Sequence, residues 1–179
     1  DLDIKALTQQ ATSAALADAG IDRSALEAAY FANVTQGHME GQHMIRGEIA
    51  LRSMGIGGIS VVNIENACAS GSTALNAAVN HIKAGQSDVV LAIGAEKMVS
   101  QNKQLMFSAF DSGWDVTASE ATTARLASMG EGVEVPEGTT SSKPFSVFMG
   151  VYAAFCRFHM KRFGTTREQI ASVAAKNHT

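Results

Sequence analysis

A strand, a helix and a second strand follow one another between residues 59 and 93, and this unit limits the folds open to the chain. Residues 59–64 are short and rich in β-branched side chains, which favours a strand. From Ser70 the apolar spacing becomes that of a helix, and a second apolar strand follows at 88–93. This order predicts a parallel sheet with a right-handed crossover, and so an α/β domain. The expected helix has one apolar face, made of Leu75, Ala78, Val79 and Ile82.

The flanking segments add further elements before and after this unit. Residues 28–34 have the pattern of a buried strand and residues 43–54 that of a helix. The chain opens with a helix that Gly20 ends, without a strand before it, so we expect the sequence to begin inside a domain. The apolar face expected for this first helix consists of Ile4, Leu7, Ala11 and Ala14.

The C-terminal third has a weaker pattern. Residues 101–144 show no periodicity and are expected to form a long loop. A helix is predicted at 149–163, and a last helix after Thr165, whose spacing to Glu168 is that of a capping box. The apolar side of the first of these helices is expected to hold Tyr152, Phe155 and Cys156.

Composition excludes several classes of protein. The chain has 179 residues, 46% hydrophobic and 17% charged, which is enough to bury the core of one domain. A net charge of −3 argues against nucleic-acid binding, and no apolar stretch is long enough to span a membrane. Two cysteines are too few for a disulfide scaffold, so we expect free thiols in a cytoplasmic protein. No metal site is predicted, because His38, Glu40 and His43 fit no zinc spacing.

Cys68 is the residue with the clearest chemical setting. It lies between the end of the strand at 59–64 and the helix that begins near Ser70. Unpaired backbone N–H groups and the helix dipole at such a position stabilise a thiolate, and small neighbours leave room for a substrate. We predict that Cys68 is a nucleophile, although a free cysteine is also a common filler of turns built from small residues.

None of the five histidines can be assigned from the sequence as the general base for Cys68. Along a helix, 13 residues at about 1.5 Å each put His81 about 20 Å from Cys68, which excludes it. His38, His43 and His159 have no flanking pattern that marks a catalytic imidazole, so none of them is assigned.

Two blocks of this sequence resemble the thiolase family. In the block 63–98, a first motif matches the N-x-C-x-S-G pattern around the thiolase nucleophile, and a second matches the G-A-E-x-M that follows the next strand. The block 148–178 resembles the helix after the thiolase loop domain, and its Met-Gly start and Lys-Asn-His ending are most similar to the sterol-carrier-protein type. The matching residues are Asn66, Cys68, Ser70 and Gly71, then Gly94, Ala95, Glu96 and Met98, and finally Met149 and Gly150.

The resemblance implies a layered αβα fold with a mixed, mostly parallel sheet, of which this chain is the first half. It divides the chain into an α/β domain at 1–100, an inserted loop domain at 101–148 and a return to the α/β domain at 149–179. It makes Cys68 the catalytic nucleophile of a two-step acyl transfer from a coenzyme A thioester and places Met149 near the acyl group. No cofactor is implied.

The resemblance also implies what this chain lacks and what it binds. In thiolases the histidine base and a second catalytic cysteine come from the second half, so this segment alone is expected to be inactive. A homodimer or higher homo-oligomer is implied, with the first crossover strand as the expected pairing edge. A eukaryotic member of this type is compatible with a peroxisomal location.

Two other functions stay open at this point. The first is a thiolase-like aldolase or lyase acting on steroid-type coenzyme A esters, in which the cysteine is dispensable. The second is a non-catalytic acyl-CoA-binding protein in which Cys68 is vestigial.

Overall fold

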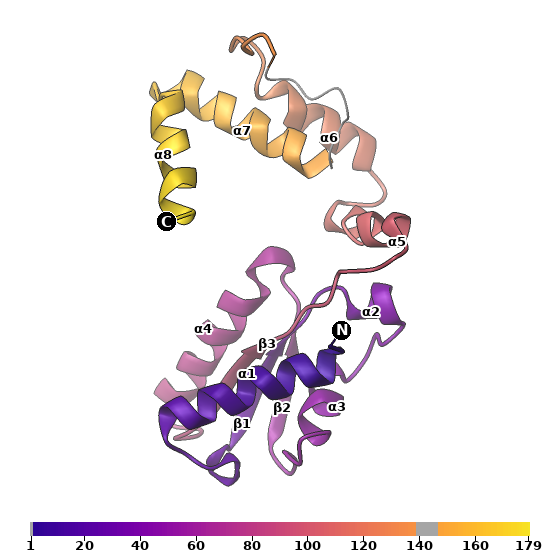
Figure 1. Ribbon diagram of the computed structural model, residues 1–179, viewed down its shortest axis with the longest axis vertical. Coiled ribbons are helices and arrows are strands. Elements are labelled where there is room, and N and C mark those ends of the chain that lie inside the picture. The colour runs from indigo at the N-terminus through magenta and orange to yellow at the C-terminus, as the bar shows by residue number, and fades with distance from the viewer. Residues whose placement is uncertain (1, 139–146) are drawn as a thin grey trace. The chain divides into compact units, whose positions relative to one another are not determined.

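The computed structural model describes residues 2–138 and 147–179, which divide into two compact units between Ala109 and Phe110. The first unit has a parallel sheet with helices packed on both of its faces, and the second consists of helices and their connections (Figure 1).

The sheet confirms the predicted parallel α/β arrangement. Its strands are β1 (Ala28–Ala32), β2 (Ser60–Ile64) and β3 (Val90–Gly94), in the order β2-β1-β3. Both neighbours of β1 run parallel to it, and the register pairs its first and last residues with theirs, so all three strands end at one edge of the sheet. The connection from β2 to β3 therefore passes across β1 and carries α4 (Ser70–Lys83) over the sheet.

The two faces of the sheet are covered by different helices. The Tyr30 hydroxyl lies 3.0 Å from Nδ1 of His81 on α4, so Tyr30 faces that helix. Phe31, the next residue, points to the opposite face because side chains alternate along a strand. There it packs against α3 (Arg46–Arg52), where a Cβ added to Gly47 would come within 2.5 Å of the Phe31 Cβ. Figure 1 shows α1 (Ile4–Ala19) on the same side as α3.

The main core lies between the sheet and this α1–α3 layer. It buries the β1 residues Ala29 and Phe31 together with side chains from β3 and both helices, and Val61 of β2 packs against it half-buried. The other buried members are Ile4, Leu26, Ala50, Leu51, Ile56, Leu91, Ile93 and Ala95.

Two predicted helix faces are right only in part: Ile4 and Leu7 on α1 and Ala78 on α4 pack inward as expected, whereas their other members do not. On α1 the fully buried residues are Ile4, Thr8 and Thr12, whereas Ala11 and Ala14 are exposed. The Thr8 hydroxyl donates to the Ile4 carbonyl at 2.7 Å, which lets this polar side chain enter the core.

Helix α4 likewise buries small residues in place of large ones. Ala74 and Ala78 face the sheet, and Leu75, at 59% exposure, does not. Val79 and Ile82 are exposed as well. Alanine allows the helix backbone to approach the strands closely, and this close approach turns the larger apolar side chains away from the sheet.

The stretch expected to be a long loop contains helices. These are α5 (Lys103–Ser108) in the first unit and α6 (Ser119–Ser128) in the second, with a short 3-10 turn at Asp111–Gly113. The short α2 (Gln36–Glu40) was not predicted either. Such short helices hold too few residues for an apolar period to stand out. Residues 139–144 of the expected loop lie outside the described residues.

In the second unit α7 (Val147–Phe163) packs on α6 through small residues. Val151 and Ala154 are buried, and a Cβ added to Gly130 would lie 3.0 Å from the Ala154 Cα. Cys156 is therefore not the buried packing residue expected from the sequence: it is exposed, as is Tyr152.

The last helix, α8 (Arg167–Asn177), begins one residue later than predicted. Its N-cap is Thr166, which forms a capping box with Gln169, and not Thr165 with Glu168. The Thr165 hydroxyl lies 2.7 Å from Nδ1 of His159 on α7.

Candidate active site

The candidate site lies where the three parallel strands end. Ala32, Ile64 and Gly94 are level with one another, so the loops that follow them leave the sheet at one edge. In open parallel sheets, ligands bind outside this carboxyl edge. The loop after β2 carries Cys68, and the other two loops carry a hydrogen-bonded network described below.

Cys68 lies in a tight turn between β2 and α4, as predicted. The turn is a 3-10 helix over Ala67–Ala69, and the thiol is exposed. Ala67 has φ of 45°, a left-handed conformation that L-residues other than glycine and asparagine seldom adopt. Such strained residues cluster at functional sites, and here the strain falls on the residue directly before the cysteine.

Hydrogen bonds within the turn hold this conformation. The Ser70 hydroxyl accepts from the Asn66 amide at 2.8 Å and donates to the Ala67 carbonyl at 2.7 Å. The Ala67 amide donates to the Glu65 carboxylate at 2.7 Å, and the Asn66 side chain donates to Thr73 Oγ1 at 2.9 Å. Ser70, the first residue of α4, is buried, and its hydroxyl bonds connect the turn to this helix. Cys68 itself remains exposed.

The start of α4 leaves its first amides without a side-chain cap. Its N-cap is Ala69, which has no side-chain acceptor. The first N–H groups of a helix have no partner within the helix, and they carry the positive end of its dipole. The Ser70 amide itself donates to the Ala67 carbonyl, so what Cys68 meets two residues further on is the positive end of the α4 dipole.

The two other loops at this edge are joined by Asn33 and Glu96. Asn33, only 2% exposed, follows β1, and its Nδ2 donates to the Ala95 carbonyl at 2.8 Å and to Glu96 Oε1 at 3.1 Å. Its Oδ1 accepts from the Gln36 amide at 3.1 Å and from Arg46 at 2.8 Å. Each hydrogen-bonding position of this buried amide is used.

Sequence reasoning missed Asn33 and Arg46 and noted Glu96 only as part of a motif. The available signal was a polar Asn33 directly after an apolar strand, at the edge where ligands bind in α/β folds. The partner of Asn33 lies 63 residues away, so the pairing itself depends on the order of the strands.

Among the described residues, the hydrogen bonds found for His38, His81 and His159 go to residues other than Cys68. His81 is engaged by Tyr30 and by Ser87, whose hydroxyl lies 2.9 Å from Nε2, which agrees with its exclusion on distance. His38 lies 3.0 Å from the Ser108 hydroxyl, and His159 pairs with Thr165.

Met149 belongs to the second unit, at the start of α7, and its side chain is 55% exposed.

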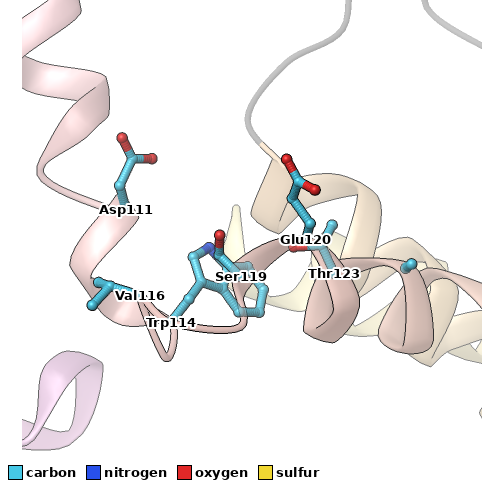
Figure 2. Close-up of a pocket in the computed structure, with 7 residues that line it drawn as sticks. Asp111, Trp114, Val116, Ser119, Glu120 and Thr123 are labelled. Carbon is cyan, nitrogen blue, oxygen red and sulfur yellow. The ribbon is translucent and has the colours of Figure 1, made fainter.

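The same unit contains an open pocket of 660 Å³ beside α6 (Figure 2). Trp114 stacks on Phe148 with ring centroids 4.4 Å apart. The lining residues are Asp111, Trp114, Val116, Ser119, Glu120, Thr123 and Ala124. With two carboxylates and no basic side chain in its lining, this pocket is unsuited to the phosphates of coenzyme A.

Neither a metal centre nor a membrane span is found in the part of the chain that the structure describes. Residues 2–138 and 147–179 contain no group of three or more His, Cys, Asp or Glu side chains placed to hold a metal ion. Within the same residues, no helix has both the length and the apolar character needed to cross a bilayer.

Comparison with known proteins identifies the family. The family model described as "Thiolase, N-terminal domain" matches residues 1–179. The chain is 32% identical to an acetyl-CoA acetyltransferase of Methanothermobacter thermautotrophicus over 99% of its own length and 40% of that protein. It is 34% identical to sterol carrier protein 2 of Homo sapiens, over 98% of its length and 28% of that protein. A benzoylsuccinyl-CoA thiolase subunit of Thauera aromatica is 27% identical over 99% of the chain and 38% of the subunit.

The chain thus spans less than half the length of each of these relatives. The match nevertheless covers both described units, the Cys68 turn and the three strand ends. With its parallel α/β sheet, the chain belongs to the thiolase family and is an N-terminal thiolase domain.

Proposed function

We propose that the protein is a thiolase-type acyltransferase in which Cys68 accepts the acyl group of a coenzyme A thioester. The observation that carries the proposal is the exposed thiol in a strained turn at the start of α4. Membership of the thiolase family and the acetyl-CoA acetyltransferase relatives support this chemistry.

In the first step the Cys68 thiolate attacks the carbonyl carbon of the thioester. A carbon–sulfur bond forms to Cys68, and the negative charge moves to the carbonyl oxygen, where backbone N–H donors at the start of α4 stabilise it. The bond to coenzyme A then breaks, and its thiolate leaves and is protonated. The products are an acyl thioester on Cys68 and free coenzyme A. Because one thioester replaces another, the exchange is close to isoenergetic.

In the second step a nucleophile removes the acyl group from Cys68. That nucleophile is the enolate of acetyl-CoA in the synthetic direction, and the reverse reaction cleaves a 3-ketoacyl-CoA with coenzyme A. The base that ionises Cys68 and the acid that protonates the leaving group belong, in this proposal, to the remainder of the protein. We therefore expect the 179-residue segment alone to be inactive.

The experiment is mass spectrometry of the whole protein after incubation with acetyl-CoA. We expect one acetyl group on the peptide that contains Cys68, and none in the Cys68→Ala variant. Cys156→Ala is the matched control, because it removes the other exposed thiol and should leave acylation unchanged. Turnover that survives Cys68→Ala would indicate aldolase or lyase chemistry. Binding of coenzyme A without any acyl-enzyme would indicate a non-catalytic binding protein.

Met149 and the loop region complete the proposed substrate site. In this proposal residues 101–148 cover the substrate and residues 149–179 return to the α/β domain, with Met149 against the acyl chain. Met149→Ala should then raise the KM for longer acyl-CoA substrates more than for acetyl-CoA. An equal change for all chain lengths would contradict an acyl contact.

We also propose that the protein is a homo-oligomer that pairs through β2. In the described part of the first unit, β2 pairs with β1 along one side only, and its central Val62 is exposed at 38%. A free strand edge is a template for pairing with another chain. Val62→Lys should shift the protein toward monomers in sedimentation analysis, whereas Val173 on α8, which is 57% exposed, should accept lysine without effect.

A further inference from the structure

The Glu96 carboxylate binds the backbone of a loop that is distant in sequence. Glu96 follows β3, and its Oε2 accepts from the Val34 amide at 2.8 Å. The Thr35 amide donates to Oε1 at 3.1 Å, and the Thr35 hydroxyl donates to the same oxygen at 2.5 Å. One side chain thus fixes the two residues that follow Asn33, with bonds that its negative charge strengthens.

The same loop is also bound by Arg46. The Arg46 guanidinium donates to the Val34 carbonyl at 3.4 Å and to Asn33 Oδ1 at 2.8 Å. The amides of the loop therefore bind a carboxylate, and its carbonyl and buried amide side chain bind a cation. The negative charge of Glu96 binds the donors of the loop and the positive charge of Arg46 binds its acceptors, which fixes the orientation of these groups.

Asn33 connects this arrangement to the strand that leads to Cys68. Its backbone amide donates to the Ile64 carbonyl at 3.2 Å, at the last residue of β2. Ile64 lies four residues before Cys68, and the turn between them is internally hydrogen-bonded. A displacement of the Asn33 loop would therefore move the point from which the Cys68 turn starts.

We propose that Glu96 is a positioning residue for acyl transfer at Cys68. Its hydrogen bonds hold the loop after β1 against the end of β3, and this loop in turn holds the end of β2. The inference rests on the proposed function of Cys68. Glu96 acts through Asn33 and Ile64, and its own carboxylate is occupied by the loop. Its loss should therefore lower kcat while the KM for acyl-CoA changes little.

The test compares Glu96→Ala and Glu96→Gln with the unsubstituted protein, in the whole enzyme. The first readout is hydrogen–deuterium exchange at the amides of Val34 and Thr35, which Glu96 protects. The second is the kcat and KM of acyl transfer. We expect faster exchange and a fall in kcat of about tenfold or more in Glu96→Ala, with KM within about twofold, since small misplacements of reacting groups cost rate steeply. Glu96→Gln keeps the shape of the side chain without its charge, so its exchange rates and kcat should lie between those of Glu96→Ala and the unsubstituted protein.

The control is Asp18→Ala, which removes an exposed carboxylate from α1 in the same unit and should change neither readout. Unchanged exchange in Glu96→Ala, or faster exchange with unchanged kcat, would overturn the positioning role. If Glu96→Ala does not fold, Glu96→Gln decides by the same two readouts. Absence of any acyl group on Cys68 in the unsubstituted protein would refute the proposed function instead, and the exchange measurement would still decide whether Glu96 holds the loop.

Discussion

Replacement of Asn33 by leucine tests whether the polar network at the carboxyl edge stabilises the fold. Leucine has the same branched shape but is larger, so the substitution removes the hydrogen bonds without opening a cavity, and any steric strain adds to the loss. It leaves the Gln36 amide and the Ala95 carbonyl without their side-chain partner, and both residues are only 9% exposed. At about 1–3 kcal/mol for each buried polar group left unpaired, the loss amounts to about 2–6 kcal/mol.

A loss of that size is a large part of the stability of a typical domain, about 5–15 kcal/mol. The assay is urea unfolding followed by circular dichroism, together with native-state amide exchange in β1. Tryptophan fluorescence is unsuitable, because the single tryptophan, Trp114, lies in the second unit and not with Asn33.

The matched control is Asn80→Leu, the same replacement at an exposed position of α4. It should change the free energy of unfolding by about 0.5 kcal/mol or less. A loss below about 1 kcal/mol for Asn33→Leu would refute the reasoning, since the groups around Asn33 would then have found other partners or water.

Three further predictions concern single residues. The pKa of Glu27 is lowered from 4.5, chiefly because the Val89 amide donates to its carboxylate, so its stabilising effect is complete at neutral pH and is lost as the pH falls below that value. Glu27→Gln should therefore flatten the acid-side decline in urea-measured stability, and an unchanged decline would contradict this. Ala67→Gly should raise stability by up to about 1 kcal/mol because φ is 45°, whereas Ala69→Gly, at φ of −96°, should not. Thr166→Ala should lower the local stability of the start of α8 by about 1 kcal/mol, which would appear as faster amide exchange there. Exchange equal to that of the unsubstituted protein would exclude a stabilising cap.

Local sequence patterns were sufficient to predict the strands of the first unit and its helices α1, α3 and α4, but not the short α2 and α5. The apolar runs at 28–34, 59–64 and 88–93 all became strands, because a short β-branched or apolar run carries its preference locally. The strand–turn–helix setting of Cys68 followed from the same patterns, since a change of apolar period marks the boundary between strand and helix.

Helix orientation was predicted less well. Periodicity identified α1, α4 and α7, but parts of their buried faces differ from the expected ones. On α1, Thr8 and Thr12 are buried where two alanines were expected. On α4 and α7, Ala74 and Ala154 are buried where leucine, tyrosine or cysteine was expected. Hydrophobicity alone ranks large apolar residues as the buried ones. The observed packing depends on how closely two backbones approach, and only small side chains permit the closest contacts.

The sequence by itself determined the three strands and the helices α1, α3, α4, α7 and α8, and it determined that a cysteine lies at the start of a helix. Only the tertiary structure decided which loops meet at the carboxyl edge of the sheet. The order β2-β1-β3 places the end of β1 between two strands that come later in the chain. Glu96 thereby reaches the Val34 amide across 62 residues of sequence. Contacts over such separations depend on strand order and register, which residue preferences along the chain do not encode.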